Sequence, residues 1–154
     1  MDCLEGLKLL DDNCIDLTVT SPPYDDLRKY NNNFDFKNVV KQLFRVTKDG
    51  GVVVWIVADK TKNGSESGTS FGQALFFKEI GFSLHDTMIY MSDKPPLTHN
   101  RYEQKFEYMF VLSKGKPKTF NPIMEKCKYA GSDKKQGHFG IREKNCRKHT
   151  LRSR

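Results

Sequence analysis

The stretch Thr20-Ser21-Pro22-Pro23-Tyr24 combines residue types that suit recognition of a flat, polar group. Proline fixes φ and has no backbone N–H, so two adjacent prolines form a stiff loop that presents carbonyl oxygens. The Ser21 hydroxyl can accept or donate a hydrogen bond, and the Tyr24 ring can stack on another ring. Hydrogen-bond acceptors beside an aromatic ring fit a planar group with an exocyclic amine, such as a nucleobase. A proline-rich turn with a surface tyrosine would have the same sequence, and these residues alone leave both interpretations open.

The position of this stretch favours a ligand site. Residues 15–19 form a short apolar-leaning run that predicts a buried strand ending at the proline pair. In open α/β sheets, ligands bind beyond the carboxyl ends of the strands. The stretch therefore occupies a place where such sheets bind ligands.

The chain after this stretch predicts a helix and a strand, and then a second helix. Apolar residues on one helical face predict a helix over 36–46, and the β-branched run over 52–58 predicts a strand buried on both sides. A polar loop leads to a helix over 71–80, with Ser70 as its N-cap and Gly81 just beyond its last turn.

Two further strands are predicted over 84–91 and 106–112. Because no helical pattern separates them, we expect them to pair antiparallel at an edge of the sheet. The order strand–helix–strand–helix–strand indicates an α/β domain with a mostly parallel sheet.

The charge is unevenly distributed along the chain. Residues 1–113 hold 13 Lys/Arg and 16 Asp/Glu, whereas residues 114–154 hold 13 Lys/Arg and 3 Asp/Glu. A basic segment on a near-neutral body indicates contact with a polyanion, with nucleic acid as the leading candidate. A solvated or disordered tail is the alternative.

Particular basic residues are candidates for contact with DNA phosphates. Lys114, Lys116 and Lys118 alternate with other residue types, as an extended segment along a phosphate backbone would require. Arg101 and Lys105 precede the last predicted strand and are further candidates. The alternative is that these side chains only keep surface loops soluble.

Other classes of protein are disfavoured by composition. No apolar run approaches the roughly 20 residues that span a bilayer, and the acidic N-terminus does not resemble a signal peptide. The four cysteines and four histidines lack the spacing of metal ligands. We therefore expect a cytoplasmic protein without a bound metal.

Residues 21–24 resemble motif IV of the amino-directed DNA methyltransferases, (D/N/S)-P-P-(Y/F). The similarity extends in family order over residues 2–122, through the segments DCLEGLKLLDDNCIDLTVTSPPY, KDGGVVVWIVAD, EIGFSLHDTMIY and RYEQKFEYMFVLSKGKPKTFNP. This resemblance implies a Rossmann-like methyltransferase fold that uses S-adenosylmethionine. It also implies methylation of an exocyclic base amine in DNA, with N4 of cytosine favoured by the serine variant of the motif and N6 of adenine as the alternative.

The resemblance implies a role for each residue of the motif. The Ser21 hydroxyl and the Pro22 carbonyl accept hydrogen bonds from the target amine, and Pro23 completes the stiff loop. Tyr24 stacks on the base after it has been flipped out of the duplex. Asp2 matches an acidic residue that lies near the adenine of the cofactor in many members of the family.

One part of the family pattern is missing from the sequence. The segment D-P-F-x-G-x-G, which contacts the cofactor in family members, is not found. We therefore expect residues 1–122 to form the catalytic half of a methyltransferase domain and residues 123–154 to form a basic segment, either the start of a DNA-recognition region or a disordered tail. Such a fragment would leave an apolar face of the sheet uncovered and would invite a homodimer or a complementary methyltransferase half. A catalytically inactive DNA-binding remnant is the alternative function.

Overall fold

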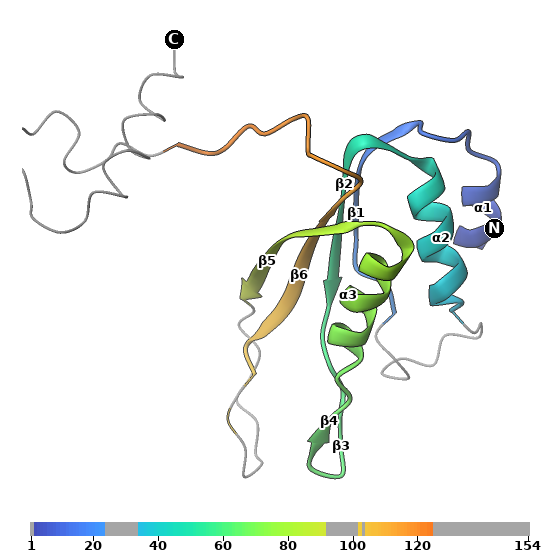
Figure 1. The fold of residues 1–154 in the computed structure, drawn as a ribbon. Helices are drawn as coiled ribbons and strands as arrows, with labels where there is room; N and C mark the ends of the chain where they lie inside the picture. The colour runs from blue at the N-terminus through green and yellow to red at the C-terminus, as the bar shows by residue number, and fades with distance from the viewer. Residues whose placement is uncertain (1, 24–33, 92–101, 103, 125–154) are drawn as a thin grey trace, which may run out of the picture. The chain divides into compact units, whose positions relative to one another are not determined.

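The computed structural model describes residues 2–23, 34–91, 102 and 104–124 (Figure 1). The chain divides into two compact units, and the unit Met1–Phe120 holds all the helices and strands of the described residues. Among the helices described, none is both long and apolar enough to cross a membrane.

The described residues form three helices and six strands. The helices are α1 (Cys3–Lys8), α2 (Phe36–Val46) and α3 (Thr69–Ile80). The strands are β1 (Ile15–Thr20), β2 (Thr47–Val57), β3 (Thr61–Lys62), β4 (Ser65–Glu66), β5 (Ser83–Met91) and β6 (Phe106–Ser113). The strands β3 and β4 pair only with each other, as a short ribbon.

The other strands form a four-stranded mixed sheet in the order β1-β2-β6-β5. The strands β1 and β2 are parallel, and β6 is antiparallel to both of its neighbours, so β1, β2 and β5 share one direction. The predicted α/β class and the antiparallel pair at the sheet edge are confirmed. The insertion of β6 between β2 and β5 was not predicted, because the sequence pattern carried no information on this long-range pairing.

The second strand begins earlier than its apolar run. It starts at Thr47, directly after α2, and contains Gly50 and Gly51, which the sequence pattern placed between two elements. Gly51 is buried, and a Cβ atom there would lie 2.8 Å from the Thr47 side chain and 3.1 Å from the Asp16 carbonyl. Glycine is therefore needed where β2 passes close to β1.

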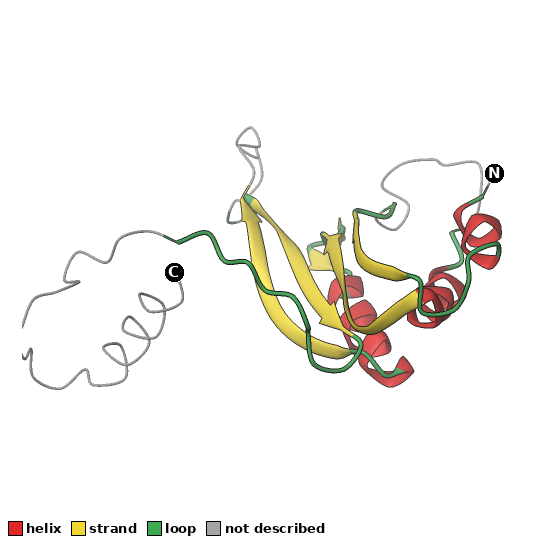
Figure 2. Ribbon diagram, turned by 90° about the horizontal axis from the view of Figure 1, so that it is seen from above, coloured by secondary structure: helices red, strands yellow, loops and turns green. Residues whose placement is uncertain are grey.

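The core lies between the sheet and the helices α2 and α3, which cover the same face of the sheet (Figure 2). Trp55 of β2 is almost completely buried there, and its indole N–H donates to Oε1 of Gln73 on α3 at 2.8 Å. The Trp55 ring also packs against Phe77 of α3, with ring centroids 5.1 Å apart. The prediction that Trp55 belongs to the core is confirmed.

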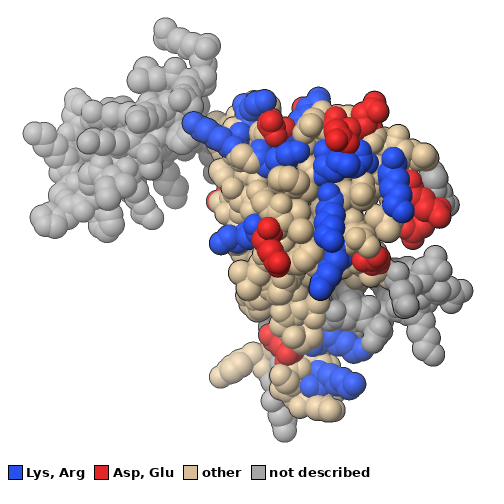
Figure 3. All heavy atoms as spheres, turned by 45° about the vertical axis from the view of Figure 1, so that its right-hand side comes forward, with Lys and Arg blue, Asp and Glu red and all other residues tan. Residues whose placement is uncertain are grey.

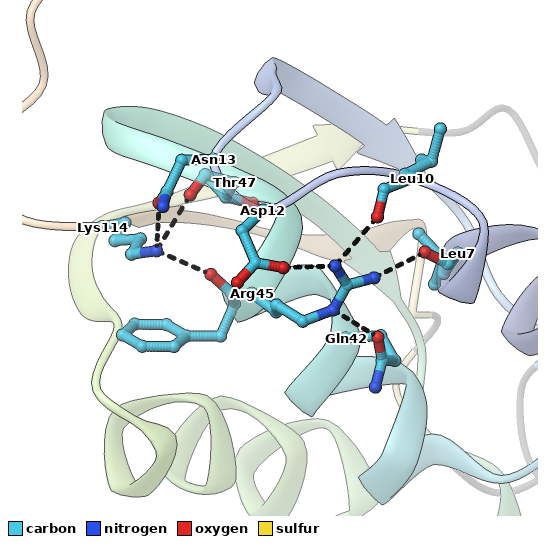
Figure 4. Close-up of polar contacts among 9 residues, drawn as sticks. Leu7, Leu10, Asp12, Asn13, Gln42, Arg45, Thr47 and Lys114 are labelled. Atoms are coloured by element: carbon cyan, nitrogen blue, oxygen red, sulfur yellow. Dashed lines mark hydrogen bonds and ion pairs between the residues drawn. The ribbon is translucent and has the colours of Figure 1, made fainter.

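The N-terminal segment is attached to α2 through the Arg45 side chain (Figure 4). Its Nη2 donates to the Leu7 carbonyl at 2.8 Å, and its Nη1 donates to the Leu10 carbonyl at 2.8 Å and pairs with the Asp12 carboxylate. Its Nε donates to Oε1 of Gln42 at 2.7 Å. The guanidinium thus bonds to one carbonyl in the last turn of α1 and to one just after this helix, and so ties the N-terminal segment to α2.

Replacing Arg45 with Met should destabilise the protein, because the aliphatic stem is kept while these charge-assisted hydrogen bonds are lost. We expect a loss of about 1.5–3 kcal/mol in the free energy of unfolding, measured by urea denaturation. The control is Lys48→Met, which removes the exposed ion pair between Lys48 and Asp16 and should cost less than about 1 kcal/mol. Equal shifts of the two midpoints would contradict this role of Arg45.

Candidate active site

Residues 21–23 leave the sheet at the carboxyl end of β1, as the sequence predicts. Thr20 pairs with Trp55 of β2, so Ser21 follows beside the carboxyl half of β2. Ser21 is exposed, Pro22 is buried and Pro23 is half-buried. Proline suits this buried position because it has no backbone N–H that would need a partner. The corner therefore places Ser21 at the surface, directly before the rigid and buried Pro22.

The chain re-enters the described structure next to this corner. Phe34 stacks on Trp55 with ring centroids 6.5 Å apart and an interplanar angle of 28°, and Phe36 lies 5.9 Å from the same ring. Trp55 in turn pairs with Thr20 at the end of β1. The segment that carries Tyr24 therefore begins and ends at the same end of the sheet, although Tyr24 itself, like Arg101, lies outside the described residues.

A buried carboxylate lies at the same end of the sheet. Asp59 follows the end of β2, and its carboxylate accepts hydrogen bonds from the Ser67 hydroxyl at 3.0 Å, from the Ser70 backbone N–H at 3.0 Å and from the Ser70 hydroxyl. The helix α3 begins after Gly68, which has no side chain to cap it. A negative charge near a helix N-terminus is stabilising, so Asp59 caps α3 from outside the helix.

This arrangement corrects the predicted role of Ser70. The sequence pattern placed Ser70 at the N-cap, but it lies inside α3, buried, with both its N–H and its hydroxyl bonded to Asp59. Asp59 was missed as the cap of α3 because it was grouped with the polar loop that follows it. Its signal in the sequence is the acidic side chain directly behind the carboxyl end of a buried strand, which is where ligand-site residues gather in such sheets.

The charge of the Asp59 carboxylate affects the pKa of Tyr108 on β6. Burial raises the pKa of the Tyr108 phenol, and the nearby charges of Asp59 and Glu66 raise it further. The phenol therefore stays protonated and remains a hydrogen-bond donor over a wider pH range than an exposed tyrosine. The Tyr108 ring also packs against Phe71 of α3, with ring centroids 5.1 Å apart.

The structure gives Lys114 a different role from the predicted phosphate contact. Its ammonium donates to the Asn13 side chain at 2.8 Å, to the Phe44 carbonyl at 2.9 Å and to the Thr47 carbonyl at 3.0 Å (Figure 4). It also lies 4.7 Å from the centre of the Phe44 ring, and the side chain is only 15% exposed. Because these three bonds use all the donors of the ammonium, Lys114 ties the C-terminal end of α2 to the segment before β1 and to the start of β2.

Lys116 and Lys118 are exposed but lie far from Ser21. The Lys118 N–H donates to the Gly50 carbonyl at 3.2 Å, which places both lysines near the amino end of β2. Ser21 lies at the opposite end of β1, and a strand of this length spans about 20 Å at 3.3 Å per residue. On the face shown in Figure 3, the Lys and Arg side chains of the described residues are interspersed with Asp and Glu. The structure therefore does not bring these lysines together with the Ser21 corner.

Asp2, the expected cofactor contact, begins the helix α1. Its Oδ1 accepts a hydrogen bond from the Leu4 backbone N–H at 2.8 Å, so its carboxylate acts as the N-cap of this helix. Among the described residues, no three His, Cys, Asp or Glu side chains gather as a metal site would require.

Comparison with known proteins gives relatives of one kind. Residues 15–150 match the family model described as DNA methylase. The orphan methyltransferase M.BamHII of Bacillus amyloliquefaciens is 58% identical over 132 residues, which cover 83% of this chain and 50% of M.BamHII. The type II beta methyltransferase M.BslI of Bacillus sp. (strain NEB-606) is 30% identical over 149 residues, which cover 78% of this chain and 16% of M.BslI. The chain thus spans half or less of the length of these relatives.

Solved structures share the fold at lower identity. The PvuII DNA methyltransferase (cytosine-N4-specific) matches with a TM-score of 0.62 and 21% identity, over 76% of this chain and 49% of that one. The complex of M1.HpyAVI with S-adenosylmethionine matches with a TM-score of 0.58 and 23% identity, over 82% of this chain and 60% of that one. The mixed sheet with α2 and α3 on one face is therefore the fold of DNA methyltransferases, and since the family model spans most of the chain, this protein belongs to the DNA methylase family of the N6/N4 type.

Proposed function

We propose that this chain supplies the base-binding part of a DNA methyltransferase, which transfers a methyl group from S-adenosylmethionine to an exocyclic base amine. N4 of cytosine is the favoured target and N6 of adenine the alternative. The observation that carries the proposal is the corner at residues 21–23: an exposed serine over a buried proline at the carboxyl end of β1, in a chain of the DNA methylase family.

The corner can bind an amine without forming a covalent bond to it. The Ser21 hydroxyl and the Pro22 carbonyl each accept a hydrogen bond from one N–H group of the amine, and this raises the electron density on the amine nitrogen. Tyr24 stacks on the flipped base and fixes its plane. S-adenosylmethionine, when bound, supplies an electrophilic methyl group on a sulfonium. The contribution of the chain is therefore position and hydrogen-bond acceptance at the amine.

The described residues fit the base better than the cofactor. A strand-to-helix turn with glycines, as a nucleotide-like cofactor requires, occurs in the described chain between β2 and α3, but its helix N-terminus is already bonded to Asp59 and Ser67. Asp2 is the cofactor contact that we retain as a proposal from the described chain. The rest of the cofactor site must come from other residues.

DNA backbone contacts are proposed at the same end of the sheet as Ser21. Lys105 precedes Phe106, which pairs with Met91 at the carboxyl end of β5, and β5 runs in the same direction as β1. Lys105 is therefore the described basic residue that we propose for a phosphate flanking the flipped base, and Arg101, which lies outside the described residues, remains a proposed contact from the sequence. Lys116 and Lys118 remain proposed contacts for a more distant part of the duplex.

The stacking role of Tyr24 is tested by Tyr24→Ala. Binding of the chain to a pool of duplexes, each with one cytosine opposite an abasic site in randomised sequence, is measured by fluorescence anisotropy. Loss of stacking should cost about 1–3 kcal/mol, which raises Kd about 5- to 150-fold. The control is Leu75→Ala, a truncation of a large, exposed apolar side chain on the outer side of α3, which should leave Kd unchanged. An unchanged Kd for Tyr24→Ala would exclude the stacking role.

Recognition of the amine is tested by comparing duplexes that carry cytosine or uracil opposite the abasic site. Uracil presents a carbonyl in place of the amine of cytosine, so the Pro22 carbonyl would face another acceptor. We expect the chain to bind the cytosine duplexes more tightly than the uracil duplexes, and Ser21→Ala to reduce this preference about 2- to 10-fold by removing one neutral hydrogen bond. The control is Ser83→Ala, an exposed serine at the start of β5.

Equal affinity of the unmodified chain for cytosine and uracil would refute amine recognition by the corner. The same comparison between adenine and hypoxanthine distinguishes the two proposed target bases. A preference for adenine over hypoxanthine that exceeds the preference for cytosine over uracil would favour N6 of adenine.

A further inference from the structure

The sheet has a second face that the described helices leave uncovered. Residues of β2 alternate between the core and this second face, and strand pairing places the apolar residues of the neighbouring strands beside them. We call this surface the open face and define it by Leu17, Val19, Val54, Met88, Tyr90 and Met109.

The open face is exposed on its outer strands β1 and β5 and half-buried at Val54 and Met109 in its centre. Leu17 and Val19 of β1 are 59% and 60% exposed, and Met88 and Tyr90 of β5 are each 51% exposed. The helices α2 and α3 lie on the other face, against Val53, Trp55 and Val57 (Figure 2). The strand register also places Asp86 and Glu107 on this face, beside Met88 and Tyr90. A contiguous exposed patch that is mostly apolar and carries a few polar residues marks an interaction site.

The outer edge of β1 adds to this surface. In the described sheet β1 is the last strand on its side and pairs with β2 alone. An edge strand presents a row of backbone N–H and C=O groups that can accept a further strand. The exposed apolar residues Leu17 and Val19 lie on this same strand, so one partner can cover the face and extend the sheet.

We propose that the open face and the edge of β1 bind the complementary half of a methyltransferase, that is, polypeptide of the kind that makes up the rest of the relatives' length. The inference rests on the proposed function and names the partner of the same site. M.BamHII is 58% identical in the matched part and has as much chain again outside it. The matched structures likewise have 40–51% of their chain outside the match.

This occupant also completes the chemistry. The described residues bind the base side of the reaction, and a partner added beside β1 lies next to the Ser21 corner, which ends that strand. A second copy of this chain would add another base corner and, of the proposed cofactor contacts, only a second Asp2. The complementary half is therefore the occupant that the site requires.

The test is association of the full chain with the part of M.BamHII outside the matched residues, produced as a separate polypeptide. Sedimentation velocity should show a complex with one copy of each. Leu17→Glu should weaken the complex more than about tenfold, because docking would bury a carboxylate without a partner. The matched control is Leu75→Glu on the outer side of α3, where the leucine is 64% exposed, and it should leave the affinity unchanged.

Association measured in this way needs neither cofactor nor DNA, so it is independent of the proposed function. Failure to associate, association that Leu17→Glu leaves intact, or a homodimer of this chain that Leu17→Glu disrupts would each overturn the inference. Circular dichroism of Leu17→Glu checks that the variant is folded, and native spectra are expected because the side chain is exposed. A complex that forms but shows no preference for cytosine over uracil would refute the proposed function and leave the interface standing.

Discussion

The Trp55 side chain is the point on which the arrangement of the described structure depends. In the sheet, Trp55 of β2 is paired through its backbone strand with Thr20 at the end of β1 and with Phe110 of β6. Its indole N–H donates to Gln73 of α3. Its ring contacts the start of α2 through Phe36. Because a buried indole N–H without a partner is costly, the bond to Gln73 fixes α3 relative to the sheet. The packing of Trp55 also fixes the end of β1, which Ser21 directly follows. The position of the serine corner thus follows from packing in the core.

The elements that were predicted well are those whose pattern is local. The helix over 36–46 was predicted with the bounds that the structure has, because its apolar residues repeat at helical spacing and turn residues flank it. The strand before Ser21 and the two later strands were predicted for a similar reason. The errors concern features set by distant residues. Gly51 lies where β2 passes close to β1, and Gly50 lies where it passes close to the segment after β6. Ser70 lies inside α3 because Asp59 replaces it as the cap.

The site was predicted in part, and its charged residues show why. The corner at residues 21–23 is recognisable because two prolines and a strand end are local features. Lys114 belongs to the basic segment over residues 114–154, yet its ammonium is bonded within the fold to residues as distant as Asn13. The amino-acid composition does not distinguish such a lysine from one that is exposed at the surface. Only the packing of the chain separates the cations that stabilise the protein from those that face a polyanion.

The central position of β6 has a consequence for how the protein is made. The strand β2 pairs with β6 from Val57 opposite Tyr108 to Val52 opposite Ser113, so residues 58–113 must leave the ribosome before the middle of the sheet can close. Until then the nascent chain holds β2 with its apolar side chains exposed to water and to other chains. Pairing across a long stretch of sequence is slow to form and prone to aggregation. Chaperone contact during synthesis would protect this protein at the stage just before β6 emerges.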